Sequence, residues 1–185
     1  MVQKSAETVK EVEHCFSLLF AAYMDPKFTK NRLLSKKTER PFLPLIRAAL
    51  LGYFQKRVVP EVSVRWTEKG TRGKRRDKTG RIDFRVGDMA IEFAMRGSTA
   101  AGANLSPLTN TPEIRKLMKW KNGRSILVLF DYSKTPYSPS SLDAYRRNPG
   151  LGSGTHRKPF TLLYYHRTGE HFKQTTHIKK VIRRG

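Results

Sequence analysis

Apolar and polar residues alternate from residue 81 to residue 93, and this is the clearest pattern in the chain. Such alternation is typical of half-buried strands, and Gly87-Asp88 in its middle suits a two-residue turn. The segment therefore predicts a β-hairpin that places Asp83 opposite Glu92 on its polar face. The other face is apolar throughout: Ile82, Phe84, Val86, Met89, Ile91, Phe93 and Met95.

Helical spacing dominates the part of the chain that precedes the hairpin. An apolar stripe predicts one helix over residues 5–24 and a second over 43–57, with Pro44 in its first turn. Residues 58–66 alternate as a strand, although Pro60 weakens its start. Residues 67–80 are rich in glycine and basic side chains, and they are interpreted as a loop that projects into solvent or onto a ligand.

Strands and helices alternate after the hairpin. Thr111-Pro112 begins a helix whose lysines, Lys116 among them, are expected to face solvent. The apolar run from Ser125 to Phe130 predicts a strand buried on both faces and parallel to its neighbour. A short helix over 138–147 and a last strand over 160–165, turning near residue 168 into a hairpin, complete the pattern.

These elements predict an α/β fold, a mixed central sheet flanked by helices. We expect residues 1–40 to form an N-terminal helical arm with a basic linker. Residues 41–185 would then form the α/β domain, and the chain would end in a basic C-terminal tail.

The charge balance indicates the class of partner. The chain has 37 Lys and Arg against 15 Asp and Glu, a formal net charge of +22. Such a charge favours a nucleic acid, whose condensed counterions are released by basic side chains. Of the two nucleic acids we expect DNA rather than RNA, a choice that does not come from the charge. A basic structural protein of a ribonucleoprotein particle is an alternative. Candidate contacts are Arg72, Lys74, Arg75, Arg76, Lys78, Arg85, Lys179, Lys180, Arg183 and Arg184.

Other classes receive little support from the sequence. Cys15 is the only cysteine, which argues against a disulfide framework and a thiolate cluster. No apolar run approaches the length of a membrane span, and charged residues interrupt the first residues where a signal peptide would lie. We therefore expect no membrane association and a reducing, cytoplasmic location. A homodimer or a protein partner is left open.

Two acids opposite each other on a sheet need an explanation in so basic a chain. Like charges directly across a ladder are destabilising, so a cation between Asp83 and Glu92 is the simplest reason to keep both. Salt bridges to Arg81, Arg85 or Arg96 on the same face are the competing explanation.

The order of elements from residue 42 to residue 132 resembles the PD-(D/E)XK nuclease superfamily. In that superfamily a helix is followed by a three-strand meander, with Asp on the second strand and Glu-X-Lys on the third, then a helix and a parallel strand. The resemblance implies a restriction-endonuclease-like fold and a hydrolase. It implies an endonuclease that uses Mg²⁺ or Mn²⁺, held by Asp83, Glu92 and the backbone carbonyl of Phe93.

The chain departs from this family at the lysine position. Two residues after Glu92 the sequence has Ala94. Arg96 on the same strand face, or Arg81 across the hairpin, could replace the missing cation, although arginine is a poor base. Glu61 is a possible extra acid, with a solvated surface role as its alternative. A catalytically inactive nucleic-acid-binding protein with the same fold, or a subunit of a nucleoprotein complex, is the second interpretation.

Overall fold

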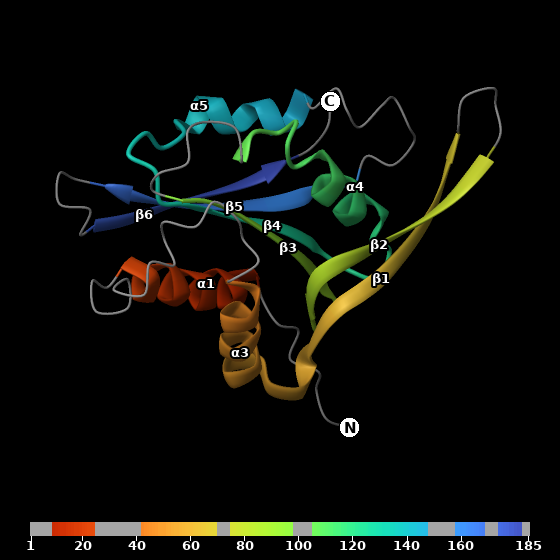
Figure 1. Ribbon diagram of the computed structural model, residues 1–185, viewed down its shortest axis with the longest axis horizontal. Helices are drawn as coiled ribbons and strands as arrows, with labels where there is room; N and C mark the ends of the chain where they lie inside the picture. The colour runs from red at the N-terminus through yellow and green to blue at the C-terminus, as the bar shows by residue number, and fades with distance from the viewer. Residues whose placement is uncertain are drawn as a thin grey trace.

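A mixed six-stranded sheet organises the computed structural model of the chain (Figure 1). The model describes residues 9–24, 42–69, 75–97, 105–147, 158–168 and 174–182. The strands lie across the sheet in chain order: β1 (Val58–Lys69), β2 (Arg75–Val86), β3 (Met89–Arg96), β4 (Ser125–Asp131), β5 (Phe160–Thr168) and β6 (Gln174–Ile182).

Both kinds of strand pairing occur in this sheet. The pairs β1–β2, β2–β3 and β5–β6 are antiparallel, whereas β4 runs parallel to β3 and to β5. Every residue of β4 is buried, as the apolar run predicts for a central parallel strand. The expected class, an α/β fold with a mixed sheet, is confirmed.

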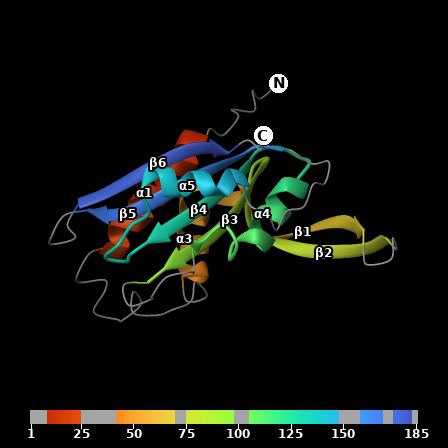
Figure 2. The same cartoon turned by 90° about the horizontal axis from the view of Figure 1, so that it is seen from above.

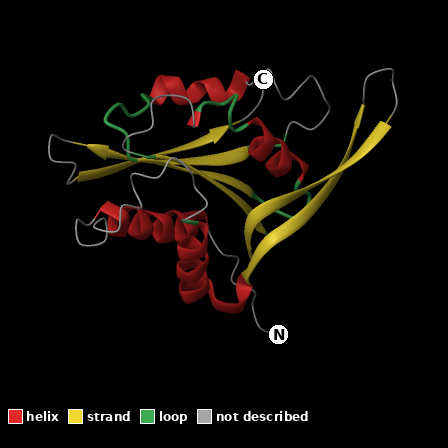
Figure 3. Cartoon of the chain, viewed as in Figure 1, coloured by secondary structure: helices red, strands yellow, loops and turns green. Residues whose placement is uncertain are grey.

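Helices cover the two faces of the sheet (Figure 3). One face carries α1 (Val9–Met24) and α3 (Leu43–Phe54), which continues into a 3₁₀ turn at Gln55–Arg57. The other carries α4 (Thr111–Lys119) and α5 (Pro139–Leu142), with a 3₁₀ turn at Asp143–Arg147. No helix in these described ranges combines the length and apolarity needed to cross a membrane.

Helix α1 packs into the main core of the protein. Phe16 stacks on Phe93, and Phe20 stacks on Tyr132, while both helix residues meet the edge of Phe130. The helix of the expected N-terminal arm, residues 9–24, therefore lies against the sheet. Their apolar stripe completes the sheet's hydrophobic layer, and a division at residue 40 separates no second core.

The long ribbon formed by β1 and β2 replaces most of the loop expected over residues 67–80. The two strands pair from Val58 and Val86 out to Lys69 and Arg75, and the ribbon extends beyond the rest of the sheet (Figures 1 and 2). Polar residues on both faces and three glycines had concealed this strand pattern. Residues 70–74 lie outside the described part.

The ribbon turns over at Asp83. Phe84 belongs to the core under α1 and α3, whereas Ile82 belongs to the core under α4, although the two share one parity along β2. The β2–β3 ladder runs from Val86 and Met89 only to Phe84 and Ile91. The apolar residues expected on a single face are therefore divided between two cores, with Ile82 apart from the others. Strand β2 also leaves β3 at the point where the sequence pattern predicted that their pairing would continue.

A strained residue marks the same point on β1. Glu61 lies between the pairs Pro60–Phe84 and Val62–Ile82, which places it opposite Asp83. Its φ of 52° is uncommon for a residue other than glycine. The local backbone is therefore distorted at the position where the ribbon changes layers.

The expected turn at Gly87-Asp88 is present, and Gly87 adopts a φ of 58° that glycine reaches without strain. This turn packs tightly against the loop between α4 and β4. Trp120 donates its Nε1–H to the Asp88 carbonyl over 2.9 Å. A Cβ atom placed on Gly123 would lie 2.2 Å from that same oxygen. Only glycine therefore fits at residue 123 without a backbone shift.

We expect Gly123→Ala to lower the free energy of unfolding by about 2 kcal/mol, the usual cost of forcing extra atoms into a packed site. Urea denaturation would measure the change. Gly52→Ala is a suitable control, because a Cβ at residue 52 meets nothing within 4 Å. Equal stability of the two variants would contradict the tight contact at Asp88.

Candidate active site

Asp83 lies where β2 separates from β3. At this point its side chain, and not the backbone of β2, forms the hydrogen bond to the backbone of β3. The Phe93 N–H donates to Asp83 Oδ2 over 2.9 Å. Burial raises the pKa of the Asp83 carboxyl above its ordinary value, although the Phe93 N–H and the Lys116 ammonium act in the opposite direction. The site thus holds a carboxylate in an environment that disfavours its charge.

Glu92 is fully buried on β3. Lys116 Nζ donates to its Oε2 over 2.7 Å, while its Oε1 is enclosed with no hydrogen-bond partner among the described residues. Burial, followed by the nearby charge of Asp83, raises the pKa of Glu92 well above its ordinary value. An enclosed carboxylate oxygen without a donor is costly, so a proton shared with the neighbouring Asp83 carboxyl or a cation would be favourable there.

Lys116 is the third member of this cluster, and it corrects the expectation that it faces solvent. Its Nζ also donates to the Arg81 carbonyl over 2.9 Å, on the stretch of β2 that has left β3. Burial lowers the pKa of Lys116, but the charges of Glu92 and Asp83 outweigh that effect and the pKa is raised. Lys116 is therefore an ammonium ion at neutral pH.

Gly80 leaves space for the stem of Lys116. A Cβ on Gly80 would lie 3.0 Å from Lys116 Cδ and 3.1 Å from a ring carbon of Trp66. The lysine chain therefore passes close over the glycine, with Trp66 beside it. A side chain at residue 80 would require the lysine stem or the Trp66 ring to shift by a few tenths of an ångström.

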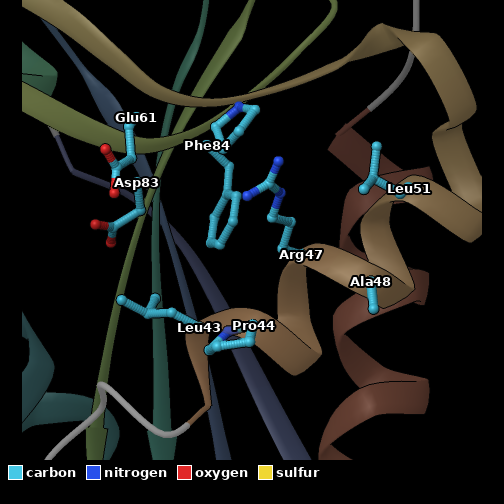
Figure 4. A pocket seen from close by; sticks show the side chains of 9 residues that line it. Leu43, Pro44, Arg47, Ala48, Leu51, Glu61, Asp83 and Phe84 are labelled. Atoms are coloured by element: carbon cyan, nitrogen blue, oxygen red, sulfur yellow. The ribbon is translucent and has the colours of Figure 1, made fainter.

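A pocket of about 620 Å³ opens beside Asp83 (Figure 4). Glu61 and Asp83 lie next to each other on one side of Phe84, and Arg47 of α3 lies on its other side. The remaining lining residues are mostly apolar: Leu43, Pro44, Ala48, Leu51 and Pro60. The pocket gives a ligand access to the carboxyl group of Asp83.

The two arginines proposed to replace the missing lysine are both engaged elsewhere. Arg81 Nη1 contacts Glu61 Oε2 over 2.9 Å, and both side chains are largely exposed. Arg81 does not pair with Ala94, because the β2–β3 ladder ends before that position. Arg96 does share the strand face of Glu92, but its guanidinium binds the buried carboxylate of Asp131.

Further contacts fix Arg96 in this second polar cluster. Its Nε donates to Asp131 Oδ1 over 2.9 Å, its Nη2 donates to the Thr135 carbonyl over 2.7 Å, and its guanidinium lies 4.6 Å from the Tyr137 ring centre. The structure therefore places Lys116, not Arg96, beside the acids.

The proposed nucleic-acid contacts occupy different environments. Arg85 is half-buried, and its Nε has no hydrogen-bond partner within the described residues. Lys78 is exposed on β2, where Arg75 and Arg76 are described only as strand backbone. Arg72, Lys74, Arg183 and Arg184 lie outside the described residues.

The expected basic C-terminal tail is corrected for its first two lysines. Lys179 contacts Glu13 over 2.6 Å, and Lys180 contacts Asp143 over 2.8 Å, both from strand β6. These lysines pair with acids of α1 and of the turn after α5, because the segment forms the last strand of the sheet rather than a free arm.

The donor set at Asp83 and Glu92 fits a hard divalent cation. Mg²⁺ is commonly held by one or two carboxylates together with water molecules, and the enclosed Glu92 Oε1 receives no hydrogen bond from the residues that the structure describes. Across the described ranges, no group of three or more His, Cys, Asp or Glu side chains converges on one point. A metal here would therefore rest on two carboxylates, with Phe93, which follows Glu92, as the candidate carbonyl.

Lys116 is the residue that sequence reasoning missed. The only signals were a small residue, Ala94, at the expected lysine position and a lysine-rich helix shortly after the acidic strand. Comparisons with protein-family models, with curated proteins and with solved structures find no match to this chain.

Proposed function

We propose that this protein is a metal-dependent endonuclease that hydrolyses phosphodiester bonds, in DNA rather than RNA, with Asp83, Glu92 and Lys116 as its active site. The observation that carries the proposal is the buried carboxylate of Glu92, which lies beside a second carboxylate and a lysine and whose Oε1 has no hydrogen-bond donor among the described residues. Perturbed acids of this kind concentrate at functional sites. A net charge of +22 suits a polyanionic substrate.

The order of elements supports a restriction-endonuclease-like fold for this site. Helix α3, the β1–β2–β3 meander, α4 and the parallel strand β4 follow one another as in the PD-(D/E)XK nucleases. The departure at Ala94 is compensated in our proposal by Lys116, which brings the missing ammonium from α4 to Glu92.

Each residue has a defined task in this proposal. Asp83 and Glu92 would hold Mg²⁺ or Mn²⁺, which when bound supplies a water of lowered pKa and neutralises charge on the phosphate. The Phe93 N–H orients Asp83, and Glu92 orients the Lys116 ammonium. Because the pKa of Lys116 is raised, this side chain donates hydrogen bonds to a negatively charged phosphate oxygen and does not act as a base.

A second function is favoured by the ion pair between Lys116 and Glu92. This pair compensates one buried charge without any metal, as expected for a protein that binds nucleic acid and does not cut it. In either case we propose a cytoplasmic protein, because it has a single cysteine. One such site cuts one strand, so cleavage of both strands would involve a second copy or a partner.

Asp83→Asn separates these functions. We expect the variant to lose Mg²⁺-dependent cleavage of supercoiled plasmid and of a labelled single strand, and to keep the wild-type affinity for DNA. We also expect its metal-free form to melt no lower than the wild type. Folding raises the pKa of Asp83, so its carboxyl stabilises the folded protein at pH values below the unfolded pKa. This stabilisation is lost as the pH rises through the folded pKa, so the charged group gives none at neutral pH.

Asp88→Asn, an exposed acid in the turn that follows the same strand, is the matched control and should cleave normally. Binding without cleavage by the wild type would support the non-catalytic function. Cleavage that survives Asp83→Asn would rule out this site.

A further inference from the structure

One face of the β1–β2 ribbon is polar and exposed along its described length. Cross-strand pairs build this face, which we name the polar ribbon face: Ser63–Arg81, Arg65–Thr79 and Thr67–Asp77. Thr67 also donates its hydroxyl to Asp77 Oδ1 over 2.9 Å. The opposite face is different, because Val64 and Ile82 on it pack into the core under α4.

The polar ribbon face leads directly to the candidate active site. Toward the sheet from Ser63–Arg81, Glu61 lies between the pairs Val62–Ile82 and Pro60–Phe84, opposite Asp83. A ligand lying along the ribbon would therefore reach the Asp83 carboxyl and the pocket beside it. Figures 1 and 2 show that the ribbon extends away from the body of the protein, so a large ligand has room to approach it.

Beyond Trp66, which packs partly buried against the core under α4, the outer ribbon obtains little stability from the rest of the protein. Beyond Val64 on β1 and Gly80 on β2, no side chain described for the ribbon is fully buried. A two-stranded ribbon without such packing is marginally stable in water. Its polar face carries two arginines and several hydroxyl groups, which are the side chains that contact phosphates and base edges. Arg81 is paired with Glu61 and Asp77 lies on the same face, so Arg65 and the hydroxyl groups are the side chains that this surface offers to a phosphate or a base edge.

The chemistry of the face distinguishes a duplex from a single strand. Proteins that bind single strands stack the bases on exposed aromatic rings, and none of the six residues of the polar ribbon face is aromatic. The major groove of B-form DNA, about 12 Å wide, admits a two-stranded ribbon, whereas the major groove of duplex RNA is too narrow for side chains to read.

We infer that the polar ribbon face enters the major groove of duplex DNA and directs a backbone phosphate to Asp83. This inference rests on the proposed nuclease function for the fate of that phosphate. The groove contact itself is a binding property, and it can be measured where no cleavage occurs.

Fluorescence anisotropy with the full chain carrying Asp83→Asn, in EDTA, tests the groove contact. The probes are a 20-base-pair DNA duplex, one of its strands, and an RNA duplex of the same sequence. We expect the DNA duplex to bind about tenfold more tightly than either of the others, the ratio that corresponds to roughly 1.4 kcal/mol. Arg65→Glu should weaken duplex binding by about tenfold. It should also reduce the slope of the logarithm of the binding constant against the logarithm of the salt concentration by about one.

Lys10→Glu is the matched control, because Lys10 is exposed on α1, away from the ribbon, and the change in charge is the same. Two further probes identify the groove. Glucosylated hydroxymethylcytosine, which fills the major groove, should weaken binding about tenfold, and the minor-groove ligand netropsin should not compete.

Equal losses for Arg65→Glu and Lys10→Glu would overturn the inference. So would single-stranded DNA that binds as tightly as the duplex, or competition by netropsin alone. A failure of the nuclease proposal can be told apart from a failure of this inference. In that case the wild-type protein would show the groove-dependent binding but would cut no DNA in Mg²⁺.

Discussion

Replacing Lys116 by methionine is expected to lower the rate of DNA cleavage about a thousandfold, the effect of removing one preorganised donor from an active site. Methionine keeps an unbranched chain over Gly80 but has no ammonium group. Glu92 Oε2 and the Arg81 carbonyl then lose the donor that they share. Affinity for DNA should stay within about threefold, because one phosphate contact among many contributes little to binding.

Single-turnover cleavage with saturating protein measures the chemical step, and anisotropy measures binding in the same samples. Lys119→Met is the matched control, since Lys119 lies one turn further along α4 and no ion pair to it is seen among the described residues. Its cleavage rate should stay within about twofold of the wild type. If Lys116→Met cleaves like this control, the cation of the site is another residue and the assignment of Lys116 is wrong.

The sequence predicted those parts of the fold that depend on local patterns. Alternation and Gly87-Asp88 were sufficient for the β2–β3 hairpin, because a turn and a half-buried strand follow from neighbouring residues. The continuous apolar run predicted β4 as a central strand, because burial on both faces excludes polar side chains. Asp83 and Glu92 were found in the same way, as acids on predicted strands.

The change of layer at Asp83 could not be found from alternation. Ile82 and Phe84 have the same parity and similar hydrophobicity, so a pattern of period two assigns them to one face. The structure puts them in different cores, because the ribbon twists sharply where β2 leaves β3. That twist opens the site, so the least regular part of the strand is also the part that matters for the proposed function.

The sequence also could not predict which groups the long side chains contact. Helical spacing assigns Lys116 to a polar surface, and only tertiary structure shows that this part of the surface faces Glu92. Arg96 and Asp131 are 35 residues apart in the chain, yet they face each other across the parallel ladder of β3 and β4. Register between parallel strands leaves no local signal, so Arg96 was assigned to the acids nearest in sequence.

The pair of Arg96 and Asp131 leads to a large expected change in stability. Asp131→Asn should lower the free energy of unfolding by about 3 kcal/mol, the cost of leaving one member of a buried pair without its counter-charge. Arg96 is only 4% exposed, and its guanidinium binds both oxygens of Asp131. Tyr164 donates to the same carboxylate. The midpoint temperature of thermal unfolding should fall by about 6–12 °C for a chain of this size.

The dependence on pH identifies the cause of this loss. Burial raises the pKa of Asp131, but hydrogen bonds from Arg96, Tyr164 and Ser133 outweigh burial and leave the pKa lowered. A carboxyl group whose pKa is lowered by folding stabilises the protein at pH values above its unfolded pKa, which is about 3.9 for Asp. This stabilisation disappears as the pH falls through the folded pKa. The difference between wild type and Asp131→Asn should therefore be constant near neutrality and shrink in acid.

Asp143→Asn serves as the comparison, because Asp143 pairs with Lys180 while about half of its side chain is exposed. Exposed pairs contribute at most about 1 kcal/mol, so this variant should unfold nearly like the wild type. If both variants lose the same stability, burial does not distinguish the two pairs. Arg96 would then not depend on Asp131, and the argument that Arg96 is unavailable to Glu92 would lose its energetic support.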